Sequence, residues 1–255
     1  MNYRTIALLA LPVIASFCAV AAPDETAELA DKLIRLSAKA KGFEATLNIT
    51  EDRGSDKFEA TSSLLVSREN GWKLQGSTGS GEHQVYNDFT VSYDYYPQDK
   101  TVFKVTATTP EMKLLFRRPV NEINPLASLD RKSLKYLGKE TQDGEVLHHF
   151  EGTTTTQLLG TGDNFTRRME AWIGDADGLP RKTMEFTDES TATTVYKGLK
   201  LNPDVRPGEF KFTPPASVKV IDVNKTQGGL NEAMEPLDDK PMKKPQTAPK
   251  APPAK

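Results

Sequence analysis

The sequence contains few of the residues that build covalent cross-links, metal sites or strongly charged surfaces. Cys18 is its only cysteine, and the 255 residues include three histidines. The formal net charge is −2, and acidic and basic residues are interspersed along the chain. A surface of this kind is not typical of proteins that bind nucleic acids, so we predict no nucleic-acid partner.

Long apolar runs are also scarce. The clearest run covers residues 6–15, follows the positive charge of Arg4 and precedes the small-residue pattern Ala-Val-Ala at residues 19–21. The run is too short to cross a bilayer, and its flanks are those of a secretory signal. We therefore predict a signal peptide over residues 1–21 that is cleaved after Ala21, which places the mature protein in the periplasm.

Cys18 has two alternative fates. Cleavage after Ala21 discards it with the signal, so the mature chain would have no disulfide and would depend on apolar burial for its stability. Alternatively, Cys18 is a lipid-modified N-terminus that anchors the protein. Phe17 stands where a lipoprotein signal has a small residue, so the soluble form is favoured.

Composition divides the remainder of the chain into a domain and a tail. Residues 22–224 are about 200 residues, which suits one domain with a sizeable core. Residues 225–255 are rich in proline and lysine and poor in apolar residues. Such a segment buries too little to offset its ordering entropy, so we predict that the tail is disordered.

A helix followed by short strands is predicted from the change in hydrophobic period. Over residues 23–41 apolar residues recur at helical spacing, and Gly42 is a natural stop. After Gly42 apolar and polar residues alternate, with turn signals such as residues 52–54 and 69–71 between the runs. This pattern is typical of an antiparallel meander with one buried face.

The middle of the chain interrupts the strands. Residues 110–115 are compatible with one helical turn, and Asn124 followed by Pro125 is a favourable start for a short helix through Leu129. Residues 153–164, rich in threonine and glycine, are predicted to be a mobile loop. Further strands are predicted over residues 134–140, 146–153, 168–173, 181–187, 193–199 and 218–223.

No constellation of catalytic or metal-binding residues is evident. His148 and His149 are adjacent in a predicted strand, so they face opposite sides and cannot bind one ion together. Residues 175–178 resemble the start of a calcium loop, but Phe186 stands where the closing acid is needed, and a hairpin turn explains them. The glycine-rich residues 76–81 lack the lysine of a phosphate-binding loop. We predict no enzyme activity, no metal and no cofactor.

The apolar face of the predicted sheet has two interpretations. A long twisted antiparallel sheet tends to curl, and one amphipathic helix cannot fill the resulting trough. Either the side chains of the sheet fill the trough as an ordinary core, or it remains open as a cavity for an apolar ligand. The alternation of apolar residues leaves both interpretations open.

The C-terminal motif Phe-Lys-Phe-Thr-Pro-Pro at residues 210–215 resembles a closing signature of the periplasmic outer-membrane lipoprotein carriers (LolA/LolB-like). Four other segments resemble that family in the same order, and together they span most of residues 23–224. Glu69 and Ser217 depart from the proline and glycine usual in the family. The four segments are residues 42–47, 95–100, 124–129 and 170–181.

This resemblance implies an α+β fold in which a highly curved antiparallel sheet, an unclosed β-barrel, is covered by an N-terminal helix and a short central helical lid. It also implies a carrier or binder of acyl chains, with an acylated lipoprotein or a lipid as partner. The alternative is an envelope protein-interaction or stress-regulator module with the same fold. Inner- or outer-membrane envelope proteins are further candidate partners, and we expect a monomer.

Twelve residues follow from this hypothesis as the candidate site. The resemblance implies that Arg68, after the second strand, helps to hold the lid shut; alternatively it is a solvated residue at a strand end. We expect Leu33, Leu36 and Leu126 to belong to the lid. The residues expected to line the hydrophobic cavity are Phe43, Leu47, Ile49, Leu64, Val66, Trp72, Tyr93 and Phe103.

Overall fold

The computed structural model describes residues 23–78, 81–121, 123–157, 164–206 and 208–225. The predicted signal peptide with Cys18, and the predicted tail beyond residue 225, lie outside the described residues. So do residues 158–163 of the predicted loop.

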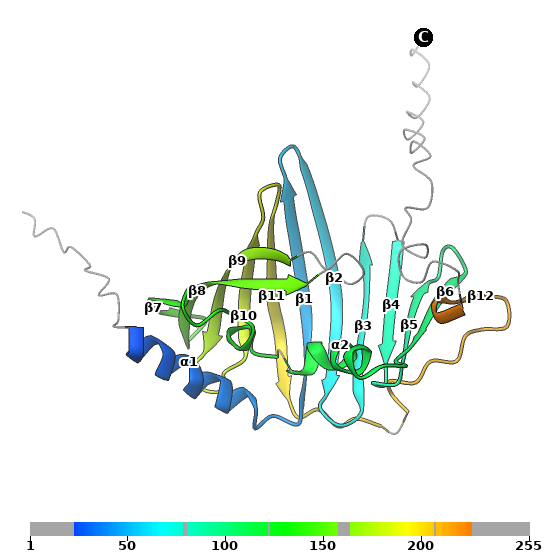
Figure 1. The fold of residues 1–255 in the computed structure, drawn as a ribbon, viewed down its shortest axis with the longest axis horizontal. Coiled ribbons are helices and arrows are strands. Elements are labelled where there is room, and N and C mark those ends of the chain that lie inside the picture. The colour runs from blue at the N-terminus through cyan, green and yellow to red at the C-terminus, as the bar shows by residue number, and fades with distance from the viewer. Residues whose placement is uncertain (1–22, 79–80, 122, 158–163, 207, 226–255) are drawn as a thin grey trace, which may run out of the picture.

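The described residues form two α-helices, two short 3₁₀ turns and one sheet (Figure 1). The helices are α1 (Pro23–Ser37) and α2 (Pro110–Asn121), and the turns are η1 (Pro125–Ala127) and η2 (Val223–Lys225). The strands are β1 (Gly42–Arg53), β2 (Asp56–Ser67), β3 (Gly71–Thr78), β4 (Gly81–Asn87), β5 (Val91–Tyr96), β6 (Thr101–Thr106), β7 (Lys135–Gln142), β8 (Glu145–Gln157), β9 (Asn164–Gly174), β10 (Pro180–Phe186), β11 (Thr191–Leu201) and β12 (Lys219–Asp222).

The sheet consists of two meanders that meet at its centre. Its order is β12-β6-β5-β4-β3-β2-β1-β11-β10-β9-β8-β7, so β1 pairs with β11 from the far end of the chain. Among the described strands β7 and β12 are the two edges, and the sheet is not closed into a barrel. This confirms the predicted open, curved sheet with helices. The exception to the antiparallel prediction is β12, which runs parallel to β6.

Irregular pairing accompanies the curvature of the sheet. The register shifts in the β1–β11, β9–β10 and β7–β8 pairs. Such bulges increase the local twist and bend the strand that carries them. At the first of them Gly198 adopts a φ of 59°, a conformation that residues with a side chain rarely take.

The helices differ from the prediction at their ends. α1 begins at Pro23 as expected but ends at Ser37, whereas residues 23–41 were predicted to be helical. The chain turns there because the Ala40 N–H donates to the Ser37 carbonyl at 3.2 Å. α2 continues to Asn121, far beyond the single turn predicted over residues 110–115.

The predicted central helix is only the three-residue turn η1. Asn124 is its cap as predicted, since the Asn124 side-chain oxygen accepts from the Leu126 N–H at 2.9 Å. The turn ends at Ala127, and the Asp130 N–H already donates to the Thr153 carbonyl of β8 at 2.8 Å. Pairing with the sheet therefore ends the turn before Leu129.

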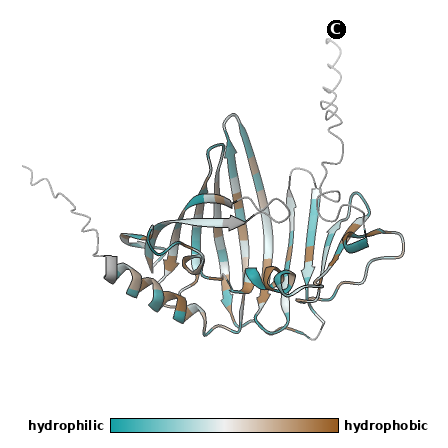
Figure 2. Cartoon of the chain, in the orientation of Figure 1, coloured by the Kyte–Doolittle hydropathy of each residue, from teal (hydrophilic) through white to brown (hydrophobic). Residues whose placement is uncertain are grey.

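Apolar side chains gather in two clusters on the helix-covered face, and Figure 2 shows apolar bands along the strands in both halves of the sheet. We call them the α1 cluster and the α2 cluster. The α1 cluster consists of Ala30, Leu33, Leu126, Leu129, Leu134, Phe150, Met169, Ala171 and Ile173. The α2 cluster consists of Phe43, Ala45, Leu47, Val66, Phe89, Val120, Ile123 and Leu179.

The turn between β9 and β10 packs closely against α1. Gly178 has a φ of 71°, and a Cβ atom there would lie 2.1 Å from the Leu33 carbonyl oxygen. Only glycine allows the turn to approach the helix so closely. The Asn124 amide also donates to the Gly178 carbonyl at 2.8 Å, so one turn contacts both α1 and the segment that precedes η1.

The opposite face of the sheet is covered in part by residues 203–206 and 208–218. Phe210 in this segment is buried, and the ring of Phe212 stacks on Tyr86 with 4.8 Å between the ring centroids. This crossing brings the chain back to the β6 edge, where it enters β12 in the parallel direction. The C-terminal motif that resembles the carrier family is therefore part of a layer outside the sheet.

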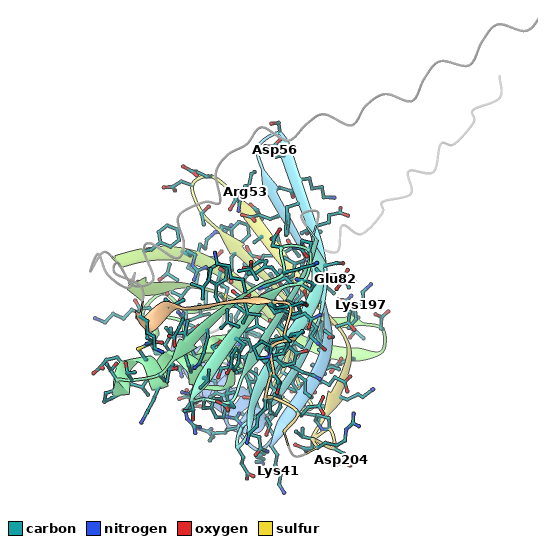
Figure 3. The ribbon with its side chains drawn as sticks, turned by 90° about the vertical axis from the view of Figure 1, so that its right-hand side faces the viewer. Lys41, Arg53, Asp56, Glu82, Lys197 and Asp204 are labelled. Atoms are coloured by element: carbon teal, nitrogen blue, oxygen red, sulfur yellow. The ribbon has the colours of Figure 1, made fainter. Side chains whose placement is uncertain are left out.

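The long β1–β2 hairpin is polar at its tip and apolar at its base. Figure 3 places Arg53 and Asp56 at the tip and Lys41 at the other end of the molecule. Phe43, near the base, is buried, and Arg53 is exposed. The helix-covered face, called the concave face below, is therefore more deeply covered at the base of this hairpin than at its tip.

Candidate functional site

Seven of the eight predicted lining residues share the helix-covered face of the sheet. Cross-strand pairing places Phe43 of β1, Val66 of β2 and Trp72 of β3 in one row. Opposite residues in neighbouring strands project to the same face, so these rings and methyl groups lie side by side. The same strand registers place the remaining four of the seven predicted residues on this face: Leu47, Ile49, Leu64 and Phe103.

The seven residues are covered to different degrees. Phe43, Leu47 and Val66 are buried within the α2 cluster, whereas Ile49, Leu64 and Trp72 pack against it and are half-buried. Phe103 lies further along the sheet on β6, where its ring meets the edge of the Tyr96 ring at 6.0 Å. Apolar surface therefore extends from beneath α2 onto a less covered part of the sheet.

The structure places Tyr93 on the other face, so the prediction that it lies with the lining residues is wrong. Tyr93 pairs with Tyr86, and both rings contact Phe212 in the outer layer. The residues of β5 that face the helices are Ser92, Asp94 and Tyr96 instead. Residues on both faces of β5 are half-buried, so its alternating pattern could not identify the inner side.

The predicted lid leucines do not cover the predicted lining residues. Leu33 and Leu126 are fully buried in the α1 cluster, and Leu36 packs against that cluster. The α2 cluster is instead covered by Val120 and Ile123, from the end of α2 and the segment after it. The sequence carried a signal for this longer helix, since Phe116 and Val120 stand four residues apart, but Pro119 between them argued against it.

Arg68 joins both helices to the sheet. Its guanidinium donates to the Ser37 carbonyl at 3.1 Å, to the Ala40 carbonyl at 2.7 Å and to the Val120 carbonyl at 3.4 Å. The first two accept at the C-terminal end of α1, where the helix dipole favours a cation. Burial lowers the pKa of Arg68 from its usual value. The interpretation of Arg68 as a solvated strand end is therefore wrong.

A polar group that the sequence did not indicate lies on the concave face of β4 and β5. His83 pairs with Asp94 through a short Nε2–Oδ1 contact, and its ring stacks on Tyr96 with centroids 4.9 Å apart. The hydrogen bond to Asp94 raises the pKa of His83. Burial, with the nearby Asp94 charge, raises the pKa of Tyr96 to about 12. The less covered half of the concave face is thus amphiphilic.

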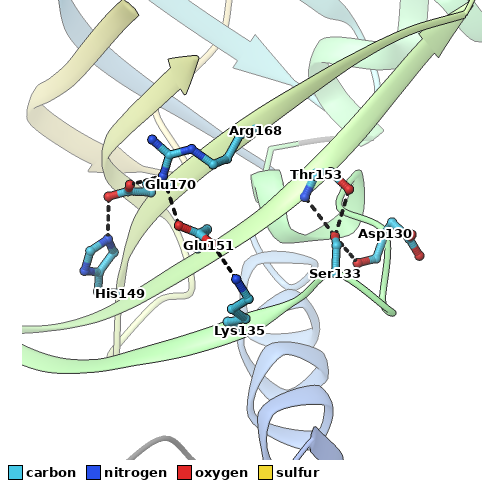
Figure 4. Close-up of polar contacts among 8 residues, drawn as sticks. All are labelled: Asp130, Ser133, Lys135, His149, Glu151, Thr153, Arg168 and Glu170. Carbon is cyan, nitrogen blue, oxygen red and sulfur yellow. Dashed lines mark hydrogen bonds and ion pairs between the residues drawn. The ribbon is translucent and has the colours of Figure 1, made fainter. Parts of the chain in front are cut away.

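The other two histidines face opposite sides of β8, as predicted. His148 is buried with its Nε2 atom 2.8 Å from Asp175 and its Nδ1 atom 3.1 Å from the Tyr136 hydroxyl. His149 faces outward, 3.0 Å from Glu170. Figure 4 shows the outer network that Glu170 shares with neighbouring charged residues of β7, β8 and β9.

Neither a metal cluster nor a membrane-spanning helix is found in the described ranges. No group of three or more His, Cys, Asp or Glu side chains among them is arranged to hold an ion. Residues 175–177, the start of the calcium-like sequence, form a turn in which Asp177 accepts from the Leu179 N–H at 2.8 Å. Within the same ranges, no helix has the length and apolarity needed to cross a bilayer.

Comparison with known proteins finds similarity in structure. No protein-family model and no curated protein matches the chain. LprF from Mycobacterium bovis is 12% identical with a TM-score of 0.46, over 76% of this chain and 98% of that one. A LolA superfamily protein from Nitrosomonas europaea is 9% identical with a TM-score of 0.38, over 73% and 97%. MucB in its complex with MucA from Pseudomonas aeruginosa is 13% identical with a TM-score of 0.43, over 77% and 63%.

A likeness at such identities concerns the fold alone, because one fold serves many functions.

Proposed function

We propose that the protein binds the acyl chains of a lipoprotein or lipid on the concave face of β1–β3, as a carrier or binder in the periplasm. The main support is the apolar surface of Ile49, Leu64 and Trp72, which is half-buried although α2 lies next to it. Removal of a chain from water onto such a surface contributes about 0.8 kcal/mol for each buried methylene. Binding of this kind needs no covalent chemistry and no cofactor.

The contacts between α2 and the sheet are compatible with a helix that can move away from the proposed acyl site. The Trp72 indole N–H donates to the Phe116 carbonyl at 2.9 Å, and the Arg68 guanidinium reaches the Val120 carbonyl. α2 also packs on the sheet through Phe116 and Val120, and the Arg117 guanidinium lies 4.2 Å from the Phe89 ring centroid. We propose that α2 is the lid over the acyl site and that Arg68 holds it in place.

An envelope protein-interaction module is the second candidate function. Leu114 of α2 is 65% exposed and Leu115 is 39% exposed, on a helix that also carries exposed Lys113 and Arg117. A protein partner could cover these leucines without any lipid. In this alternative, polar substitutions on the concave face would leave partner capture unchanged.

The acyl-chain proposal is tested by lipid analysis and by a matched pair of variants. Mature protein is purified, bound lipid is extracted for mass spectrometry, and binding of a fluorescent sixteen-carbon fatty acid is titrated. Leu64→Gln places an amide on the concave face, whereas Leu65→Gln changes the adjacent residue, which pairs with Glu44 and Lys73 on the opposite face. We expect about tenfold weaker probe binding for Leu64→Gln and little change for Leu65→Gln.

Lipid-free preparations that bind no fatty-acid probe would contradict the proposal. Equal loss of affinity in the two variants would also contradict it, because only one of them faces the proposed site.

Export through a cleaved signal is a separate proposal. It predicts a mature chain that begins at Ala22 and a division into signal peptide, domain and tail at residues 21 and 225. Mass spectrometry of the protein from a cell-envelope fraction checks both the new N-terminus and the lipid-free state of the chain. A diacylglyceryl mass on Cys18 would contradict it.

A further inference from the structure

A row of polar positions crosses the concave face beside the proposed acyl site. Strand pairing places Ser62 of β2 opposite Gly76 of β3, and Gly76 opposite His83 of β4. Opposite residues in neighbouring strands project to the same face, so the three positions form one line across the sheet. We call these three residues the polar row. Leu47 of β1 pairs with Ser62 from the other side, so the row borders the apolar surface directly.

The Ser62 hydroxyl is buried without a hydrogen-bond partner. Ser62 is 8% exposed, and within the ranges that the structure describes no group is bonded to its Oγ atom. A Cβ atom on Gly76 would lie 2.1 Å from this oxygen, so the hydroxyl occupies the place of the side chain that β3 lacks there. A buried hydroxyl with no partner in the protein needs water or a ligand to satisfy it.

His83 contributes a second polar atom to the row. Its Nε2 atom is paired with Asp94, and the other oxygen of Asp94 accepts from the Tyr96 hydroxyl at 3.4 Å. The Nδ1 atom of His83 has no hydrogen-bond partner among the described residues. The hydrogen bond to Asp94 raises the pKa of His83 and so favours the charged ring. A charged imidazole carries a proton on each nitrogen, so Nδ1–H is an unused donor.

The charges beside the row favour a neutral acceptor over an anion. The positive ring of His83 and the carboxylate of Asp94 compensate each other, and Ser62 is uncharged. An anionic head group at the row would be repelled by the Asp94 carboxylate, because like charges repel. A carbonyl oxygen needs only donors, and ester and amide carbonyls join acyl chains to lipids and to acylated proteins.

The apolar surface continues from the row toward α2. Leu64 and Leu74 pair with each other two residues from Ser62 and Gly76, on the same face, and Trp72 lies two residues beyond Leu74. The Trp72 indole then donates to a carbonyl of α2. An acyl chain whose carbonyl lies at the row can therefore extend over Leu64 and Leu74 to the region beneath α2.

We propose that the polar row binds the ester or amide carbonyl at the head of the acyl chain, through the Ser62 hydroxyl and the His83 Nδ1–H. The inference rests on the proposed function, since the acyl chain on β1–β3 brings the carbonyl to the row. Gly76 has no side chain, so the ligand can approach β3 closely between the two donors.

The experiment compares two fluorescent probes that share a sixteen-carbon chain. One ends in a methyl ester, and the other ends in a methyl ether, which lacks the carbonyl. We expect the wild-type protein to bind the ester about fivefold more tightly than the ether, the effect of one or two hydrogen bonds. Ser62→Ala should remove most of this preference while ether binding is retained. His83→Phe, which keeps a ring against Tyr96 but has no nitrogen, should lower the preference in the same direction.

Ser63→Ala is the matched control. Ser63 is the next residue of β2, so it faces the opposite side of the sheet, where its hydroxyl donates to the Gln75 carbonyl at 3.3 Å. We expect this variant to keep the wild-type preference for the ester. Retained ether binding in every variant reports that the fold and the apolar surface are intact.

The outcomes separate the polar row from the acyl site. Equal binding of ester and ether by the wild-type protein would overturn the polar row as a carbonyl site and leave the acyl site standing. A preference that survives in both Ser62→Ala and His83→Phe would overturn it as well. Failure of both probes to bind would overturn the proposed function itself. The fatty acid with the same chain is the third arm: tighter binding of the acid than of the ester, dependent on Ser62 and His83, would overturn the assignment to a neutral carbonyl.

Discussion

The two halves of the sheet share the same alternation of apolar and polar residues, but their apolar residues are buried to different degrees. Under α1 and η1, strands β8 and β9 contribute to a closed core in which Phe150, Leu126 and Ile173 have no exposed surface. Under α2, strands β1–β3 carry apolar residues of similar size, but Ile49, Leu64 and Trp72 remain half-buried. The first half is thus a closed core around these residues, and the second keeps partly exposed apolar side chains.

The two halves also differ in the elements that cover them. The α1 cluster receives side chains from α1, from η1 and from Leu129 and Leu134 after it, so several segments close over β8 and β9. In the α2 cluster Val120 and Ile123 come from one region of the chain, and Phe89 and Leu179 come from the turns after β4 and β9. The apolar area of Ile49, Leu64 and Trp72 that stays in contact with water is the area whose burial would be favourable.

The largest expected effect concerns the closed core under α1, called the closed half below; the half under α2 is called the open half. Phe150→Ala removes a fully buried ring that packs 5.2 Å from the Tyr136 ring centroid, and it should lower the free energy of unfolding by about 3–5 kcal/mol. Urea unfolding followed by circular dichroism measures the loss. In the absence of urea, the folded variant should still bind the fatty-acid probe with unchanged affinity. A parallel loss of probe affinity would break the distinction between scaffold and binding surface.

Arg68→Ala tests the connection between the two halves. It removes three hydrogen bonds to carbonyl groups of both helical regions, and we expect a loss of about 2 kcal/mol in the free energy of unfolding. Hydrogen exchange of the last turn of α1 should accelerate. Arg68→Lys keeps the charge without the planar fork, so it should recover only part of the loss. An unchanged urea midpoint in Arg68→Ala would show that these bonds add no net stability.

Trp72→Phe tests the contact between α2 and the strands of the open half. It keeps an aromatic ring but removes the indole N–H that donates to the Phe116 carbonyl, so stability should fall by about 1 kcal/mol. If α2 is the lid, the fatty-acid probe should also dissociate faster in stopped-flow experiments. Unchanged dissociation, with stability reduced, would indicate that α2 does not control entry.

The smallest expected effect is a pH dependence in the open half. Asp94 raises the pKa of His83 in the folded state, so the pair stabilises the fold fully below the unfolded histidine pKa of about 6.5. That contribution is lost as pH rises from this value through the folded pKa. Both side chains are about a third exposed, so we expect less than about 1 kcal/mol. Urea titrations of wild-type and His83→Gln protein should converge at high pH, and a constant offset at every pH would contradict this account.

Some of the candidate site could be predicted from the sequence because it depended on local chemistry. The strand period placed His148 and His149 on opposite faces, and Asn124 before Pro125 identified a capped turn. Residues 153–157 were predicted to be a loop but belong to β8. Their threonines are β-branched and favour a strand, so the composition of the segment, with glycine further along, obscured the local preference.

The sequence by itself determined that the chain would form a helix and many short strands with one apolar face, because helical and strand periods are properties of neighbouring residues. Only the tertiary structure decided which face of β5 is the inner one, and that Arg68 reaches α1 and α2. Those outcomes depend on pairing between distant segments, such as β1 with β11, and on the segment of Phe212 covering the outer face. Alternation in the sequence shows that successive residues of a strand face opposite sides of the sheet. Which segments cover each side depends on residues that are distant in the sequence.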